Sequence, residues 1–213
     1  MISGANLRLA LAVLWLLAAT QAGWARTDGI QTDAVPTAAG PAGWGVGALM
    51  QALAQTRSAT VAFTESQSSP VLSTPLVSTG TLSYVAPDYM RKATLSPAPN
   101  VFTLDHDQVT LTNGTDAGTH VFNLRQDPRI AGLVEGIRAT LAGDLPTLEH
   151  FYSLSLTGDA ADWQLKLRPK DPALAQFVRL IVISGRQGRI ALIDTTSNDG
   201  SESQMSIKAD DAP

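Results

Sequence analysis

Few residues in this sequence have a type and spacing that could do chemistry. The chain has no cysteine and only three histidines, which excludes disulfides, thiolate metal sites and cysteine nucleophiles. Asp105, His106 and Asp107 combine an imidazole with two carboxylates, a ligand set that zinc accepts. An Asp-rich hairpin tip is the more ordinary explanation of these three residues, and no His-x-x-x-His spacing supports a metal. We therefore expect neither a metal nor a cofactor.

Hydrolytic chemistry has no better support in the sequence. No Gly-x-Ser-x-Gly elbow occurs, so a Ser–His–Asp hydrolase would lack its usual nucleophile motif. Asp194 interrupts an apolar run, but a charge at the end of a strand explains it better than a catalytic acid. We expect no catalytic residue and a protein that is not an enzyme.

One charged residue, Lys92, lies where it could meet a ligand. If Tyr89 and Arg91 face outward in a strand, then Met90, Lys92 and Thr94 face the opposite way. Two interpretations stay open: the ammonium meets an anionic head group at the mouth of a cavity, or the long side chain carries its charge out to solvent. We expect the second, which is the usual behaviour of a lysine.

The composition bounds the class of protein. Apolar residues make up 44% of the 213-residue chain and charged residues 16%, which indicates a folded domain with a sizeable core. The net charge of −4 leaves no excess of positive charge for a nucleic-acid partner. Aromatic residues reach only 6%, which argues against stacking platforms for sugars or bases.

The N-terminal segment is typical of an export signal. Arg8 precedes an apolar run of 12 residues, 9–20, that is too short to span a bilayer as a helix. Gly23 and Ala25 then occupy the −3 and −1 positions of a cleavage site; a membrane anchor or a core helix is the alternative. We predict an exported chain divided into a signal peptide cleaved after Ala25 (1–25), a flexible lead (26–43), a folded domain (44–207) and a frayed tail (208–213).

The elements of the folded domain follow from hydrophobic periodicity. Two stretches have the helical period, Val46 to Leu53 and Ile130 to Leu141, and the second is preceded by Asp127 as N-cap and followed by Gly143. Alternating residues predict about six strands between these helices and about five after them. No βαβ rhythm occurs, so the sheet should be antiparallel.

A sheet of about eleven strands tends to curl, and the two helices are the elements that could cover its concave face. We therefore predict an α+β fold: a curled antiparallel sheet that forms an unclosed β-barrel, with a helical lid over the concave face. Because aromatic residues are scarce, the space beneath the lid should be underfilled. A cavity for an apolar ligand is the resulting hypothesis.

The order of elements and several local patterns resemble the periplasmic outer-membrane lipoprotein carrier (LolA-like) family. Phe63-Thr64-Glu65 is similar to the family's Phe-Thr-Gln, and Pro87 to Lys92 is similar to its Pro-x-x-Phe-Arg-Trp. Phe102 to Leu111 resembles a hairpin of the family, and Trp163 to Lys170 a strand that ends in Pro-Lys. The chain departs from the pattern at Ala86, where the family often has Arg, at Met90, and at Lys92 in place of an aromatic residue.

The resemblance implies a non-enzymatic periplasmic carrier that shields acyl chains of a lipoprotein or another lipid and delivers them toward the outer membrane. The implied partners are an acyl-chain lipid or lipoprotein, an inner-membrane release complex and an outer-membrane acceptor, and we expect a monomer. The departures widen the possible cargo to a glycolipid or another acyl ester. The expected lipid-binding residues of the cavity and lid are Leu49, Leu53, Phe63, Leu82, Tyr84, Met90, Lys92, Phe102, Leu104, Ile130, Leu133, Val134, Ile137, Leu154, Leu156, Leu165 and Leu167.

Two other functions stay open. A sensor or scaffold of the same fold could bind a lipid or a lipoprotein and act through a protein partner. A periplasmic hydrolase is the third possibility, and a screen of ester and phosphate substrates would test it.

Overall fold

Eleven antiparallel strands form one sheet in the computed structural model, which describes residues 43–114, 118–126 and 128–208. The predicted signal peptide, nearly all of the predicted lead, the Asp127 cap and the end of the tail lie outside the described residues. The elements in chain order are α2 (Val46–Leu53), β1 (Ser58–Ser68), β2 (Leu76–Val85), β3 (Tyr89–Ser96), β4 (Asn100–Asp105), β5 (Gln108–Asn113), β6 (Thr119–Asn123), the 3-10 turn η1 (Leu124–Gln126), α3 (Pro128–Ala142), α4 (Leu145–Phe151), β7 (Tyr152–Gly158), β8 (Trp163–Pro169), α5 (Pro172–Ala175), β9 (Val178–Arg186), β10 (Arg189–Ser197) and β11 (Glu202–Ile207).

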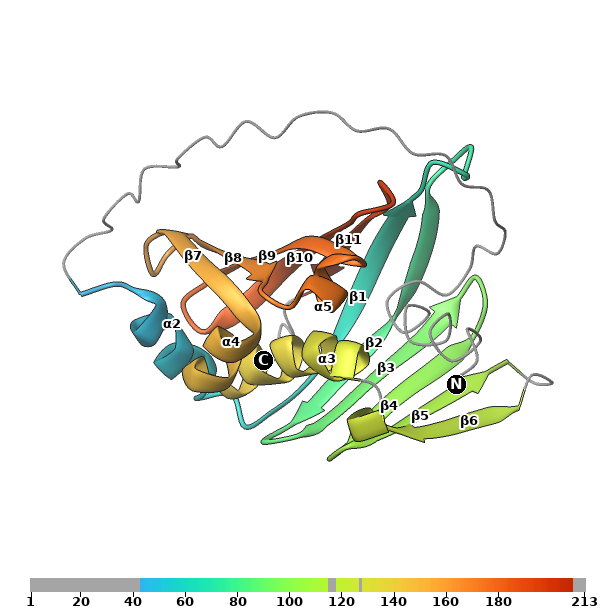
Figure 1. Ribbon diagram of the computed structural model, residues 1–213, viewed down its shortest axis with the longest axis horizontal. Coiled ribbons are helices and arrows are strands. Elements are labelled where there is room, and N and C mark those ends of the chain that lie inside the picture. The colour runs from blue at the N-terminus through green and yellow to red at the C-terminus, as the bar shows by residue number, and fades with distance from the viewer. Residues whose placement is uncertain (1–42, 115–117, 127, 209–213) are drawn as a thin grey trace. The chain divides into compact units, whose positions relative to one another are not determined.

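The sheet does not close. Its strand order is β6-β5-β4-β3-β2-β1-β11-β10-β9-β8-β7, so the first and last strands of the chain pair in the middle and β6 and β7 are the two edges. Between these edges the chain forms η1, α3 and α4, and Figure 1 shows α3 lying between the two arms of the sheet. The predicted α+β class, antiparallel pairing and unclosed barrel with helices are confirmed.

Both predicted helices form, and two short helices add to them. Leu49, Met50 and Leu53 are buried on α2, and α3 ends before Gly143, whose φ of +69° suits glycine. The segment after Gly143 forms helix α4, whose first turn is capped by the Asp144 carboxylate accepting from Thr147 N at 3.1 Å. The connection between β8 and β9 contains α5.

One face of the sheet holds the core. Neighbouring residues in a strand point to opposite faces, and residues paired across strands share a face. We call the face that carries Phe63 and its paired residues Gly80 and Ile207 the inner face. Helix α3 lies on this side, because the Tyr152 ring of β7 packs against Gly136. None of the described helices is long and apolar enough to cross a bilayer.

Candidate functional site

The register brings all the predicted strand residues of the site together on the inner face. Phe63 pairs with Ile207 on one side and Gly80 on the other, and the same alternation continues across the neighbouring strands to both arms of the sheet. The predicted strand residues on this face are Phe63, Leu82, Tyr84, Met90, Lys92, Phe102, Leu104, Leu154, Leu156, Leu165 and Leu167. Their shared face was thus correctly predicted, whereas their contact with a lipid stays a prediction.

Most of the predicted site residues on the helices are buried. Leu49 and Leu53 of α2 and three residues of α3, Ile130, Leu133 and Val134, are buried, while Ile137 is half-buried. Burial is what a covering helix requires, and half-burial leaves part of Ile137 accessible. Contact of these side chains with a ligand remains a prediction.

Two glycines determine how closely α3 packs against the sheet and against α5. A Cβ on Gly136 would lie 2.4 Å from the Tyr152 ring, and one on Gly132 would lie 3.2 Å from Leu174. The Tyr152 hydroxyl donates to the Gly132 carbonyl oxygen at 3.1 Å, and burial raises the pKa of Tyr152. Because glycine carries no apolar side chain, the hydrophobic stripe of this helix did not reveal the contact.

A buried ion pair interrupts the apolar inner face. Lys92 Nζ donates to Glu65 Oε2 at 2.6 Å, and the side chains of Lys92 and Glu65 are 16% and 1% exposed. The Lys92 ammonium also lies 5.1 Å from the centre of the Phe63 ring, within the range of a cation–π contact. The expectation that Lys92 carries its charge to solvent is therefore wrong, because its ammonium forms an ion pair with the buried Glu65 carboxylate.

Two hydroxyl groups complete the environment of Glu65. Ser203 Oγ donates to Oε1 at 2.7 Å, and Ser78 Oγ lies 3.5 Å from Oε2. A buried carboxylate needs a cation and further donors to offset the loss of water, and this group has both. Sequence reasoning did not single out Glu65 as a site residue, although its place two residues after Phe63 in an alternating strand was the available signal.

Tyr84 is a further polar residue on the inner face. It is 6% exposed, and its hydroxyl has no hydrogen-bond partner among the described residues. Burial raises the pKa of Tyr84, against the opposing effect of Arg57 and with a smaller contribution from Asp88. A buried hydroxyl without a partner is uncommon. This hydroxyl is free to donate a hydrogen bond to a bound molecule or to accept one from it.

The Asp105–His106 hairpin tip lies away from the inner face. His106 Nδ1 is 2.7 Å from Asp105 Oδ1, and Nε2 is 3.6 Å from Asp88 Oδ2. The hydrogen bond to Asp105 raises the pKa of His106, and the charge of Asp88 adds to the effect. No group of three or more potential metal ligands occurs within the described residues. Asp107 instead forms an ion pair with Arg125 at 2.6 Å.

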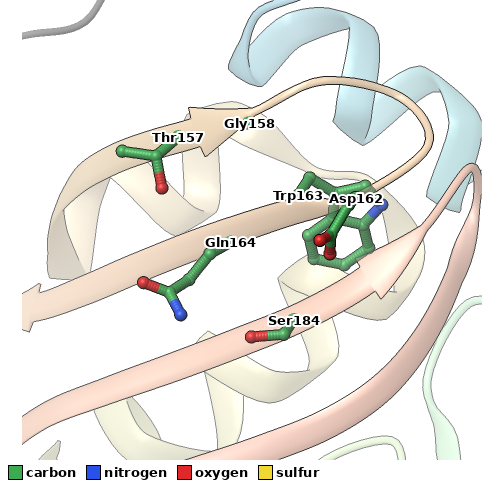
Figure 2. Close-up of a pocket in the computed structure, with 6 residues that line it drawn as sticks. All are labelled: Thr157, Gly158, Asp162, Trp163, Gln164 and Ser184. Atoms are coloured by element: carbon green, nitrogen blue, oxygen red, sulfur yellow. The ribbon is translucent and has the colours of Figure 1, made fainter.

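A polar pocket of about 270 Å³ lies at one end of β7, β8 and β9. Figure 2 shows the side chains of Thr157, Gln164 and Ser184, which the register places in one row on the outer face. Trp163 lines the pocket too, but its ring is buried and its Nε1 donates to the Gln187 carbonyl oxygen at 2.8 Å. This pocket differs in place and polarity from the predicted apolar cavity, which stays a prediction.

Comparison with known proteins yields a family and several distant structures. The sequence matches the model of a family described as "Outer membrane lipoprotein carrier protein LolA-like" over residues 38–212. Among curated proteins, no significant match is found. The chain is similar to the crystal structure of a LolA superfamily protein from Nitrosomonas europaea, at 10% identity and a TM-score of 0.39, covering 78% of this chain and 93% of that one.

Two further solved structures are similar at the same level. A DUF1329 family protein from Desulfovibrio piger has 8% identity and a TM-score of 0.41, covering 76% of this chain and 88% of that one. A chain of the Pseudomonas aeruginosa MucA/MucB complex has 15% identity and a TM-score of 0.42, covering 79% of this chain and 58% of that one.

Proposed function

Because this chain belongs to the LolA-like family of outer membrane lipoprotein carriers, whose members are periplasmic binding proteins, we propose that it is itself a carrier. It shields the acyl chains of a lipoprotein or a lipid against the inner face and delivers them toward the outer membrane. The proposal includes export by the segment 1–25, with cleavage after Ala25, and a carrier domain over 44–207.

The inner face is the observation that carries this proposal. It is a largely apolar surface, interrupted by the Lys92–Glu65 pair, that extends across an unclosed sheet and is covered by helices instead of a second sheet. An acyl chain of about 16 carbons gains about 0.8 kcal/mol per buried CH₂, or roughly 12 kcal/mol before the costs of binding. Space for the chain would come from displacement of α2 and α3, which is how a covering helix admits an enclosed ligand.

Loading and release require partners in this proposal. An inner-membrane release complex would supply the energy, since the sequence contains no Gly-rich phosphate-binding loop. An outer-membrane acceptor would take the cargo, and the carrier would act as a monomer.

Two tryptophan variants on one strand test the proposal. Leu82 is half-buried on the inner face of β2, whereas Val77 is exposed on the outer face of the same strand. The protein, produced in the periplasm, should yield acyl lipids in organic extracts and take up a fluorescent fatty-acid ester saturably. Leu82→Trp should reduce uptake at least several-fold by filling the face, and Val77→Trp should not. No lipid in the extract and no saturable uptake would exclude the carrier function.

The sensor or scaffold alternative predicts a different set of partners. A pull-down that recovers a regulatory membrane protein, with lipid binding intact, would favour it over transport. Recovery of transporter subunits would favour the carrier.

A further inference from the structure

The ion pair gives the inner face a polar subsite within its apolar surface. We propose that the Lys92 ammonium, held in place by Glu65, donates a hydrogen bond to the neutral ester or amide carbonyl group of an acyl ligand, with the Tyr84 hydroxyl as a second donor on the same face. The inference rests on the proposed function and names the class of ligand that the inner face accepts.

Lys92 retains the capacity to bind such a group. An ammonium has three N–H donors, and one of them is used by Glu65 at 2.6 Å. Within residues 43–114, 118–126 and 128–208, the other two have no hydrogen-bond acceptor, and the 16% exposure of the side chain leaves them reachable. The Phe63 ring, whose centre lies 5.1 Å from Nζ, stabilises the charge by a cation–π contact that uses no hydrogen-bond donor. The ammonium is therefore held in position with donors to spare.

Tyr84 supports the same subsite through an independent observation. Its hydroxyl is buried and has no partner in the described part of the chain. Tyr84 pairs with Met90, and Lys92 pairs with Leu82, so the backbones of the two polar residues stand in neighbouring cross-strand rows of the inner face, while the Lys92 ammonium reaches toward Glu65. A ligand that carries an oxygen acceptor would satisfy a group that the protein alone leaves unsatisfied.

Glu65 determines the charge of the ligand. Its Oε1 accepts from Ser203, and its Oε2 accepts from Lys92. An anion in contact with Nζ would lie within roughly 5 Å of this carboxylate, where the low dielectric of the interior strengthens repulsion. A carbonyl oxygen accepts the same N–H bond without net charge. The pair therefore favours an ester or amide over a free fatty-acid carboxylate or a phosphate.

Three probes of equal chain length separate these ligand classes: methyl palmitate, palmitate and hexadecane. Each competes with a fluorescent acyl ester bound to the full, lipid-stripped protein. The wild-type protein should bind methyl palmitate about tenfold more tightly than hexadecane, which corresponds to one or two good hydrogen bonds. Palmitate should bind more weakly than its ester.

Three variants locate the effect. Tyr84→Phe removes a hydroxyl without a partner, so it should fold as well as the wild type and lower the preference for the ester about three- to tenfold. The double variant Glu65→Gln/Lys92→Met should lose most of the preference and keep hexadecane binding. Lys166→Met, on the outer face of β8, is the matched control and should leave all three affinities unchanged.

The outcomes distinguish this inference from the proposed function. Failure of the wild type to bind any of the three probes would remove the carrier function itself. Equal binding of all three, unaffected by the variants, would overturn only the polar subsite, and so would palmitate binding more tightly than its ester.

Discussion

Replacing Lys92 by Met tests whether Glu65 is truly cut off from water. Methionine keeps an aliphatic side chain against Phe63 but removes the charge, which leaves a carboxylate that is 1% exposed without its cation. Breaking a buried ion pair in this way typically costs 3–5 kcal/mol.

We expect Lys92→Met to lower the free energy of unfolding by about 3 kcal/mol at pH 7. This is the lower end of the range, because Ser203 and Ser78 still donate to the carboxylate.

Urea denaturation at pH 7 measures this loss of stability. The double variant Glu65→Gln/Lys92→Met should recover most of the lost stability at pH 7, because a neutral amide needs no cation. Lys166→Met, on the outer face, should change stability by less than about 0.5 kcal/mol. A Lys92→Met protein that is as stable as the wild type at pH 7 would refute the reasoning, since Glu65 would then be exchanging its cation for water.

Two further predictions concern the α3 packing and the hairpin tip. Gly136→Ala should cost about 1–3 kcal/mol, because its Cβ would lie 2.4 Å from the Tyr152 ring; Gly47→Ala in α2, with nothing within 4 Å, should instead gain up to about 1 kcal/mol, and thermal unfolding compares the two. The hydrogen bond to Asp105 raises the pKa of His106 above its ordinary 6.5, so the stabilisation is present below the unfolded value and is lost as pH rises through the folded one. An NMR titration should show this elevation, and a value unchanged by Asp105→Asn would contradict the stated cause.

Sequence periodicity predicted which residues share a face, because alternation is a local property of a strand. The pattern around Phe63 and Lys92 therefore assigned the inner face correctly. Partners distant in sequence were not predictable, because Ser203 reaches Glu65 only through the pairing of the first strand with the last. The contact of Gly136 was missed for a different reason. Hydropathy patterns identify apolar side chains, whereas Gly136 allows the close contact with Tyr152 because it has no side chain.

The structure also relates two departures from the LolA-like sequence pattern that looked independent. Glu65 stands where that pattern has Gln, and Lys92 stands where it has an aromatic residue; in the fold they are partners at 2.6 Å. Either charge alone would be buried without compensation, at a cost of about 3–5 kcal/mol. Together they are neutral as a pair, so the two departures are tolerable only in combination. In this chain the acid and the ammonium thus lie together on the inner face, where the ammonium offers a ligand a charged donor.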